Sequence, residues 1–337
     1  MMAPRHSPRA TSAITKAFLA VSISFLGLQL PAGAQVDASS PVAQIDALNG
    51  TFGKHDGKRA SHAKGFCAQG DFTPAAKLDT FVKSPLFSQK KMDATVRFSI
   101  GGGNPGASDK SRSVRGLGAR ISGGGETYDL VLISEPVFFA STPESFVSFL
   151  QARVPDPATK KPDPAKVAAH NAKYPEAKNQ PALLASHPAP YSYATTPYYS
   201  TNAFIFKAAN KTEQHARIVV EPAAGTRYLT EQEEQSLPDL FLENELNSRL
   251  AAATAEFTIY AQLPAPGDSL TDSSQPWQGS QRVALGKLRV LNVAPQSTCD
   301  GLVFMPVTLP SGITPSDDSI LKARAPAYAV SLGRRSN

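Results

Sequence analysis

Eight short strand signals, separated by turn-rich segments, constrain the fold of this chain more than any other feature of its sequence. They occupy residues 64–72, 93–100, 115–122 and 127–133 in a first group, and residues 203–208, 215–221, 255–262 and 285–293 in a second. Gly123-Gly124-Gly125 lies between two neighbouring signals and is typical of a hairpin turn. Eight antiparallel strands can close into a barrel, whose interior is filled by side chains or holds a ligand. A sandwich of the same strands is the alternative, and periodicity alone does not choose between the two folds.

Helical signals lie between the two groups of strands, within the second group and at the C-terminus. They occupy residues 143–152, 238–252 and 317–334, and residues 154–181, rich in Pro, Lys and Ala, predict exposed helix and loop. For the last helix we expect Ser316 as the N-cap. We expect Pro326 inside that helix, where it removes a backbone donor and kinks the last turns. The predicted fold class is α+β, an eight-stranded antiparallel β-barrel with surrounding helices.

The N-terminal residues 1–34 have the three parts of an export signal. Three basic side chains form a positive start, a short apolar run follows, and Ala32-Gly33-Ala34 gives the small-x-small cleavage pattern. The apolar run is too short to span a membrane. We therefore predict a signal peptide over residues 1–34, a single domain over residues 35–337, and a periplasmic or secreted protein.

The charge of the chain is mildly basic. Its formal net charge is +6, and three of the positive charges lie in the predicted signal peptide. The surplus left after cleavage does not require nucleic acid or an anionic membrane surface as a partner. No second apolar run is long enough to span a membrane. We expect neither nucleic-acid binding nor a membrane span.

Two cysteines, Cys67 and Cys299, lie far apart in the sequence. In an exported protein an even count permits a disulfide, which here would close most of the chain into one loop. Two separate buried thiols are the alternative. Spacing alone does not show whether the two Cα atoms meet, so both interpretations stay open.

Two small groups of residues near the ends of the chain point to chemistry. Arg324 and Tyr328 are four residues apart and share a helix face, where a guanidinium favours ionisation of the phenol. A phenolate is an anionic ligand suited to ferric iron. His62 stands between two cations, Arg59 and Lys64. Taken alone, a tyrosine packed on the core and a hydrogen-bonded structural histidine are the simpler interpretations.

Five segments, in chain order, resemble the haem catalases. The resemblance lies in RASHAKGFCAQGDF (the family's R-x-x-H-A-K-G segment), ATVRFS (its V-R-F-S strand), PVFFASTPESF (its P-V-F-F segment), PSGITPSDDSIL (the approach to the ligand helix) and ARAPAY (its R-x-x-x-Y motif). The match covers most of residues 45–335. It is closest to the short exported branch called catalase-related peroxidases, which lacks the C-terminal helical domain.

The resemblance implies a haem b cofactor and a role for each matching residue. Tyr328 matches the proximal iron ligand, and Arg324 matches the arginine that keeps it ionised. His62 matches the distal histidine, which takes a proton from one peroxide oxygen and returns it to the other. The remaining matches are Arg59, Arg97 and Arg335 for the haem propionates, Ser99 for a hydrogen bond near the distal histidine, and Phe138 and Phe146 for the apolar walls.

The sequence departs from the family where large catalases place an asparagine beside the distal histidine. The stretch LISEP places Ile133 at that position, followed by Ser134. Because the amide helps to orient peroxide when a second molecule is oxidised, its absence predicts weak catalase activity. We expect an exported haem peroxidase that reduces hydrogen peroxide or small organic peroxides with an organic electron donor.

Three other functions stay open at this point. The first is a true catalase, in which Ser134 or a water replaces the amide. The second is an isomerase of lipid hydroperoxides, and the third is a non-enzymatic barrel that binds haem or another apolar ligand. The segments that interweave the tetramer of large catalases look shortened in this sequence, so we expect a monomer or a homodimer.

Overall fold

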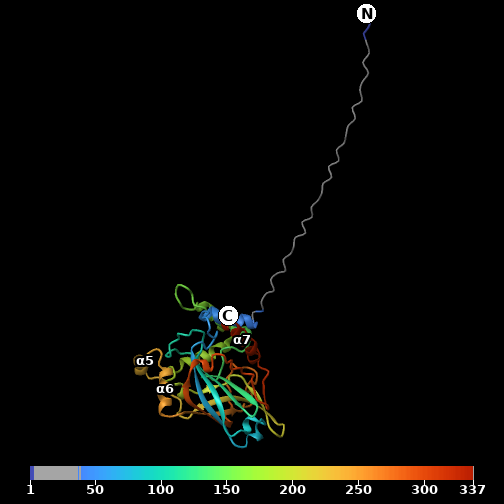
Figure 1. Ribbon diagram of the computed structural model, residues 1–337. Coiled ribbons are helices and arrows are strands. Elements are labelled where there is room, and N and C mark those ends of the chain that lie inside the picture. Colours follow the sequence, from blue (N-terminus) through green and yellow to red (C-terminus); the bar gives the residue numbers. More distant parts are fainter. Residues whose placement is uncertain (4–36, 38, 337) are drawn as a thin grey trace. The chain divides into compact units, whose positions relative to one another are not determined.

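The computed structural model describes residues 1–3, 37 and 39–336 (Figure 1). Asp37–Asn337 form one compact unit. The predicted signal peptide, apart from its first three residues, lies outside the described part of the chain. Within the described part, no helix is both long and apolar enough to cross a membrane.

The strands close into an antiparallel β-barrel, as the sequence predicts (Figure 1). Around the ring they are β1 (Gly65–Pro74), β2 (Met92–Ile100), β3 (Arg115–Gly123), β4 (Glu126–Ile133), β5 (Tyr198–Tyr199), β7 (Glu213–Pro222), β8 (Ala255–Gln262) and β9 (Arg282–Ala294). The pairing of β9 with β1 and of β8 with β7 completes the ring, which excludes an open sandwich. Of the two further strands, β6 (Phe204–Lys207) pairs with β7 beyond β5, and β10 (Ile313–Pro315) pairs with β6.

One barrel position is filled by an interrupted strand. Both β5 and β6 pair with β7, and the break between them holds Ser200 and Asn202. The Ser200 hydroxyl accepts a hydrogen bond from the Ile218 N–H at 2.7 Å, so a side chain satisfies a backbone donor that the break would leave unpaired. The sequence predicts β6 but not β5, because only two residues of β5 pair.

The barrel interior is a packed core. Side chains alternate between the two faces of a strand, and Val96, Phe98, Leu117, Leu130 and Leu132 all belong to the main hydrophobic cluster. Their neighbours along the same strands point to the opposite, outer face. The strands β2, β3 and β4 therefore bury apolar side chains inside the barrel and leave their outer face available for a second layer.

Helices supply that second layer and the outer connections. They are α1 (Pro41–Phe52), α2 (Pro143–Gln151), α3 (Pro164–Lys173), α4 (Asn179–Ala185), α5 (Glu231–Ser236), α6 (Leu242–Ala252) and α7 (Ser319–Ser336). Short 3-10 turns occupy Leu78–Thr80, Leu86–Ser88, Pro175–Lys178, Tyr193–Thr195 and Gln296–Thr298. Three of the helices, α1, α2 and α7, pack on one another around a small apolar cluster that includes Leu48, Val147 and Ala327.

The start of α7 corrects one prediction. Ser316 is not the N-cap; the helix begins at Ser319, and the Asp318 carboxylate accepts hydrogen bonds from the N–H groups of Ile320 (2.8 Å) and Leu321 (3.3 Å). A carboxylate at this position also complements the positive end of the helix dipole. Pro326 lies inside the helix, as predicted.

The two cysteines form a disulfide. Cys67 of β1 and Cys299, which follows the turn Gln296–Thr298, are bonded with a Cα–Cα distance of 6.0 Å. Both residues are fully buried. The alternative of two free thiols is therefore wrong, and the bond joins the first strand of the barrel to a loop far along the chain.

Candidate active site

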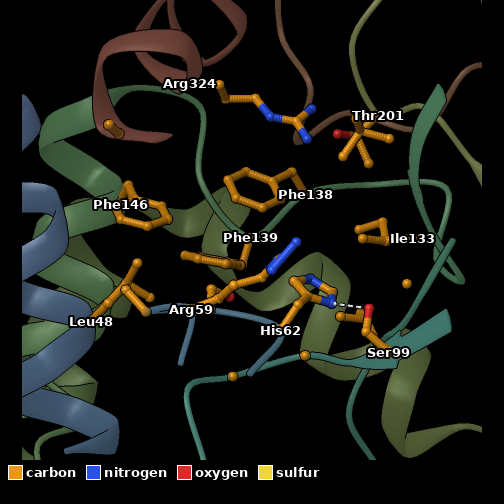
Figure 2. A pocket seen from close by; sticks show the side chains of 18 of the residues that line it. Leu48, Arg59, His62, Ser99, Ile133, Phe138, Phe139, Phe146, Thr201 and Arg324 are labelled. Carbon is orange, nitrogen blue, oxygen red and sulfur yellow. Dashed lines mark hydrogen bonds between the residues drawn. The ribbon is translucent and has the colours of Figure 1, made fainter. Parts of the chain in front are cut away.

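A cavity of about 700 Å³ lies between the outer face of the barrel and the helices (Figure 2). The barrel contributes residues from β2, β3 and β4, including Arg97, Ser99 and Gly116. The opposite walls come from α1, α2, α4 and α7. Its volume and its mainly apolar lining with a few polar groups are typical of a small-molecule site.

His62 lies in this cavity beside the barrel wall. Its backbone is left-handed, with φ of 54°, just before β1 begins. The imidazole Nδ1 is hydrogen-bonded to the Ser99 hydroxyl at 3.0 Å (Figure 2). A Cβ on Gly116 would lie 2.4 Å from the Ser99 oxygen and 2.7 Å from the His62 Nδ1. Only glycine at this position of β3 leaves room for the pair.

The surroundings of His62 keep its imidazole neutral. Burial, followed by the positive charges of Arg97, Arg324 and Arg59, lowers the pKa of His62 to about 3. A neutral imidazole has one ring nitrogen that donates and one that accepts. With Nδ1 held by Ser99, Nε2 is the ring nitrogen left for a ligand in the cavity.

Tyr328 and Arg324 lie on α7, on another wall of the same cavity. The phenol oxygen of Tyr328 accepts hydrogen bonds from Arg324 Nε (3.2 Å) and Nη2 (2.8 Å). Both donors belong to one guanidinium, so the phenol oxygen faces a cation at hydrogen-bond distance. The predicted pairing of these two residues across one helical turn is confirmed.

Two residues that the sequence does not single out as site residues orient Arg324. Its Nη1 donates to Asn202 Oδ1 at 3.0 Å, and Asn202 Nδ2 donates to Asp318 Oδ2 at 2.7 Å. Asn202 comes from the break between β5 and β6, and Asp318 is the N-cap of α7. These contacts link residues far apart in sequence, so no local pattern could reveal them.

Three arginines gather around one end of the cavity: Arg59, Arg97 and Arg335. Burial, followed by the charges of Arg97 and Arg335, lowers the pKa of Arg59 to about 9. Arg97 Nε and Arg335 Nη2 are buried and have no hydrogen-bond partner within the described part of the chain. Neighbouring cations that repel one another and present buried N–H groups without acceptors are expected to bind an anion with several oxygens.

Aromatic side chains form the apolar wall. Phe138 and Phe146 are stacked with ring centroids 6.1 Å apart, and Phe139 packs against both (Figure 2). Phe149 adds a further ring against Phe139. The sequence predicts Phe138 and Phe146 as cavity walls; Phe139 and Phe149 extend the same wall, and the spacing of Phe146 and Phe149 along α2 could have indicated the second.

Ser134 lies apart from the residues that line the cavity. Its hydroxyl accepts a hydrogen bond from the Arg115 N–H at 3.0 Å and contacts the Glu135 carboxylate at 3.5 Å. This arrangement ties the end of β4 to β3. Ile133, one residue earlier, does line the cavity, so an apolar side chain stands near His62 on this wall (Figure 2).

The site residues fit a flat iron porphyrin. The Tyr328 phenol, held by the Arg324 guanidinium, is a side chain of the type that ferric haem iron accepts as a ligand. The three arginines offer N–H groups suited to two carboxylates. Arg97 Nε and Arg335 Nη2 are buried without a partner in the described part of the chain, so a bound carboxylate would supply the acceptors that they lack. At Gly116 and Gly118 the strand β3 presents no side chain to the cavity, which leaves room for a flat ligand beside the barrel wall.

Comparison with known proteins identifies the family. The family model for catalase matches residues 56–335, and the chain belongs to the catalase family. A catalase-related peroxidase from Synechococcus elongatus is 37% identical over 300 residues, covering 88% of each chain. A catalase-related peroxidase from Mycolicibacterium paratuberculosis is 32% identical over 300 residues, covering 88% of this chain and 95% of the relative. The predicted resemblance is confirmed.

Longer catalases share the fold over part of their length. The catalase of Rattus norvegicus is 27% identical over 289 residues, which cover 80% of this chain and 55% of the rat protein. The solved structure of catalase A from Saccharomyces cerevisiae aligns with a TM-score of 0.74 at 22% identity, covering 96% of this chain and 68% of that one. The predicted barrel with its C-terminal helix is therefore the catalase fold.

Proposed function

We propose that this protein is a haem b peroxidase, which reduces hydrogen peroxide or small organic peroxides with an organic electron donor. The observation that carries the proposal is one cavity lined by a neutral buried histidine and by a tyrosine that accepts two hydrogen bonds from an arginine. The relatives named catalase-related peroxidase, which match over most of the chain, support it.

The residues of the site would hold the haem in one orientation. Tyr328 would bind the iron as a phenolate, stabilised by Arg324. Arg59, Arg97 and Arg335 would hold the propionates, which would provide acceptors for the unpaired N–H groups. When bound, haem supplies the redox chemistry with peroxide, and the protein supplies ligand, acid and base.

His62 is the group that moves a proton. Because its pKa lies near 3, the imidazole is neutral at physiological pH and its Nε2 can accept a proton from one peroxide oxygen. The same nitrogen would then return that proton to the other oxygen as the O–O bond breaks, so that this oxygen leaves as water; the two electrons would come from the bound haem and be replaced by the organic donor. The hydrogen bond between Nδ1 and Ser99 holds the ring in place, and with Nδ1–H as its donor Nε2 is the nitrogen that accepts.

The wall beside His62 favours peroxidase over catalase activity. Ile133 offers no hydrogen bond to a second peroxide molecule, and Ser134, the predicted substitute, has its hydroxyl bonded to the Arg115 backbone. A donor molecule must then supply the electrons that a second peroxide would supply in dismutation. Ser134 therefore acts on strand pairing in this proposal, not on peroxide.

The test measures two products from the same peroxide. Haem-loaded protein receives hydrogen peroxide with and without a phenolic donor, and both oxygen release and donor oxidation are recorded. We expect donor oxidation to account for most of the peroxide consumed. One oxygen per two peroxides, unaffected by the donor, would identify a true catalase instead. The absence of any peroxide turnover would identify a haem carrier.

Ile133→Asn is the matched variant for this test. It restores an amide at the wall of the cavity without changing the residues that hold the haem. We expect the share of peroxide released as oxygen to rise. If that share stays at the wild-type value, Ile133 does not set the balance between the two activities.

We further propose that the mature chain begins near Gln35, after export to the periplasm or the medium. The Cys67–Cys299 disulfide supports this, because structural disulfides persist in oxidising compartments. The intact mass of the protein purified from its native host tests the cleavage. A monomer or homodimer is the proposed assembly, and light scattering of the loaded protein tests it.

A further inference from the structure

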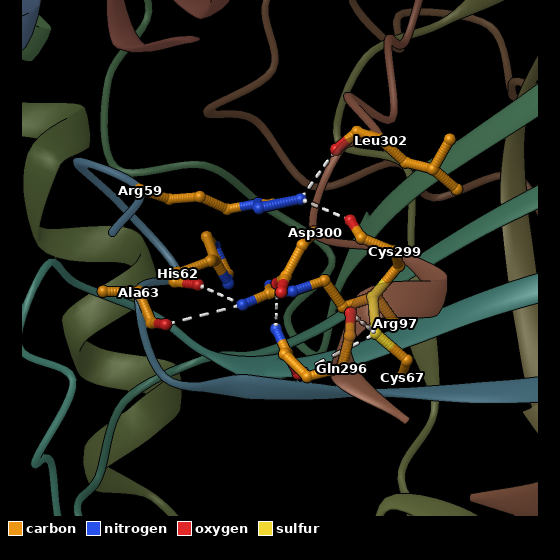
Figure 3. The surroundings of a disulfide bond; sticks show 9 residues. All are labelled: Arg59, His62, Ala63, Cys67, Arg97, Gln296, Cys299, Asp300 and Leu302. Atoms are coloured by element: carbon orange, nitrogen blue, oxygen red, sulfur yellow. Dashed lines mark hydrogen bonds between the residues drawn. A yellow bond between two sulfur atoms is a disulfide. The ribbon is translucent and has the colours of Figure 1, made fainter. Parts of the chain in front are cut away.

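Arg59 takes its orientation from one short segment, residues 295–302 (Figure 3). Its Nη2 donates to the carbonyl oxygens of Leu302 at 2.7 Å and Cys299 at 3.4 Å. Within the described part of the chain, these are the hydrogen bonds of its guanidinium. The position of the Arg59 guanidinium relative to Arg97 and Arg335 therefore depends on the position of residues 295–302.

The backbone of the segment makes no backbone hydrogen bond to the barrel in the described part of the chain, although Leu302 packs on a small apolar cluster that includes Cys67 and Ala294. It leaves β9 at Ala294, makes the single turn Gln296–Thr298, and its backbone hydrogen bonds run between its own residues. Firm anchoring resumes at Val303, whose carbonyl accepts a hydrogen bond from Arg120 at 2.8 Å. Between these two points the covalent link to the barrel is the disulfide from Cys299 to Cys67.

The disulfide ends beside a second arginine of the same group. Cys67 on β1 lies directly opposite Arg97 on β2 in the strand register. Arg97 is held separately, because its Nη2 donates to the His62 carbonyl at 3.0 Å. One bond therefore connects the segment that orients Arg59 to the strand pair that carries Arg97 (Figure 3).

We propose that the Cys67–Cys299 disulfide is a positioning element for carboxylate binding in the cavity. It fixes residues 295–302 so that Arg59 faces the propionates beside Arg97. Without the bond the segment can shift, and the affinity for the porphyrin carboxylates falls. The inference rests on one part of the proposed function, that the ligand is a porphyrin with two propionates. Its consequence is that the affinity for the cofactor depends on whether the Cys67–Cys299 bond is oxidised or reduced.

The decisive experiment uses two iron-free probes. Protoporphyrin IX carries both carboxylates, and its dimethyl ester carries neither; each is titrated into the protein and followed by porphyrin fluorescence. In the double variant Cys67→Ser, Cys299→Ser we expect the affinity for the diacid to fall about tenfold, the order of one charge-assisted hydrogen bond. The affinity for the diester should stay at the wild-type value. An equal fall for both probes, or for neither, overturns the proposal.

A cycle with single arginine variants locates the effect. In an Arg59→Gln background, loss of the disulfide should cause no further fall in diacid affinity, because the residue through which it acts is already absent. Arg97→Gln is the matched control. Because Arg97 is held by the His62 carbonyl and not by the segment, the fall in diacid affinity caused by Arg97→Gln and the fall caused by loss of the disulfide should add. Additive losses with Arg59→Gln would contradict the mechanism.

Two further measurements separate the possible failures. If the serine variant does not fold, as judged by circular dichroism, the folded wild-type protein is reduced with a phosphine and titrated with the same probes. Unchanged diacid affinity with both thiols shown free by mass spectrometry overturns the disulfide's role alone. A wild-type protein that binds neither these porphyrins nor haem itself overturns the proposed function together with this inference.

Discussion

The two functional walls of the cavity come from opposite ends of the chain and are built by different means. His62 lies just before the first barrel strand, in a left-handed backbone conformation, and is held by Ser99 and by the space that Gly116 leaves. Tyr328 lies on α7, two residues after Pro326, and its oxygen is held by a cation one turn earlier. Packing against rigid strands determines the first position, and charge determines the second.

The difference matches the chemistry proposed for each side. A group that accepts and returns a proton must be neutral at rest, and burial near cations achieves this for His62. The group proposed to bind ferric iron is the phenol oxygen of Tyr328, and Arg324, itself fixed by Asn202 and Asp318, places a cation against that oxygen. Substitutions on the Tyr328 wall should therefore reduce haem affinity, and substitutions on the His62 wall should reduce the rate of reaction with peroxide.

The largest effect is expected from Tyr328→Phe. Because the ligand oxygen is lost, haem affinity should fall by more than about 100-fold, beyond the effect typical of a residue that merely supports a ligand. Haem titration followed by visible absorbance measures this. Tyr199→Phe is the control, since it removes another phenol from the cavity lining and should keep the haem. Equal affinity in Tyr328→Phe and wild type would contradict the ligand assignment.

His62→Gln should affect the reaction with peroxide and not the binding of haem. Haem binding should persist, while the rate of reaction with peroxide falls by about 10² to 10⁴, the range for loss of a general acid–base group. Stopped-flow absorbance gives the rate, and titration gives the affinity. His170→Gln, a change at a buried histidine bonded to Ser148, is the control. An unchanged rate in the His62 variant would remove that residue from the mechanism.

Gly116→Ala tests whether close packing against β3 positions the imidazole of His62. The added methyl group would overlap the Ser99 oxygen and the imidazole, so we expect a loss of about 1–3 kcal/mol in the free energy of unfolding. The peroxide rate should fall with it, because the imidazole must move. Gly106→Ala is the control, since the nearest atom to its new Cβ would be 3.5 Å away. The same peroxide rate in both variants would show that the close approach has no role.

The smallest effect is expected from pH. The lowered pKa of His62 means that the rate with peroxide should change little between about pH 5 and 8, whereas an ordinary imidazole with a pKa of ~6.5 would lose its base on acidification. The folded state favours neutral His62, so its contribution to stability is complete above about pH 6.5 and is lost as pH falls toward 3. A rate that halves near pH 6.5 would show that the imidazole titrates normally.

The sequence predicts the walls of the cavity better than it predicts the contacts between them. The strand signals, the α2 signal and the last helix all appear in the structure, because alternation and helical spacing are local properties. The arginines, His62 and Tyr328 meet in one cavity as the resemblance implies. The helix α1 is missed, although Ser40 before Pro41 is a recognisable start signal.

What the sequence does not predict depends on closure of the barrel. The bond between Asn202 and Asp318 and the disulfide between Cys67 and Cys299 join segments separated by most of the fold, and no periodicity encodes such meetings. Ser316 illustrates a local failure. Both Ser316 and Asp318 are good N-cap residues. The N-cap of α7 is Asp318, a buried residue whose carboxylate also accepts a hydrogen bond from Asn202.

The most direct test of the central claim is a crystal structure of the haem-loaded protein. The account predicts iron bonded to the Tyr328 oxygen, with His62 on the opposite face of the porphyrin and both carboxylates among Arg59, Arg97 and Arg335. Iron bonded to His62, or a porphyrin bound outside this cavity, would contradict it.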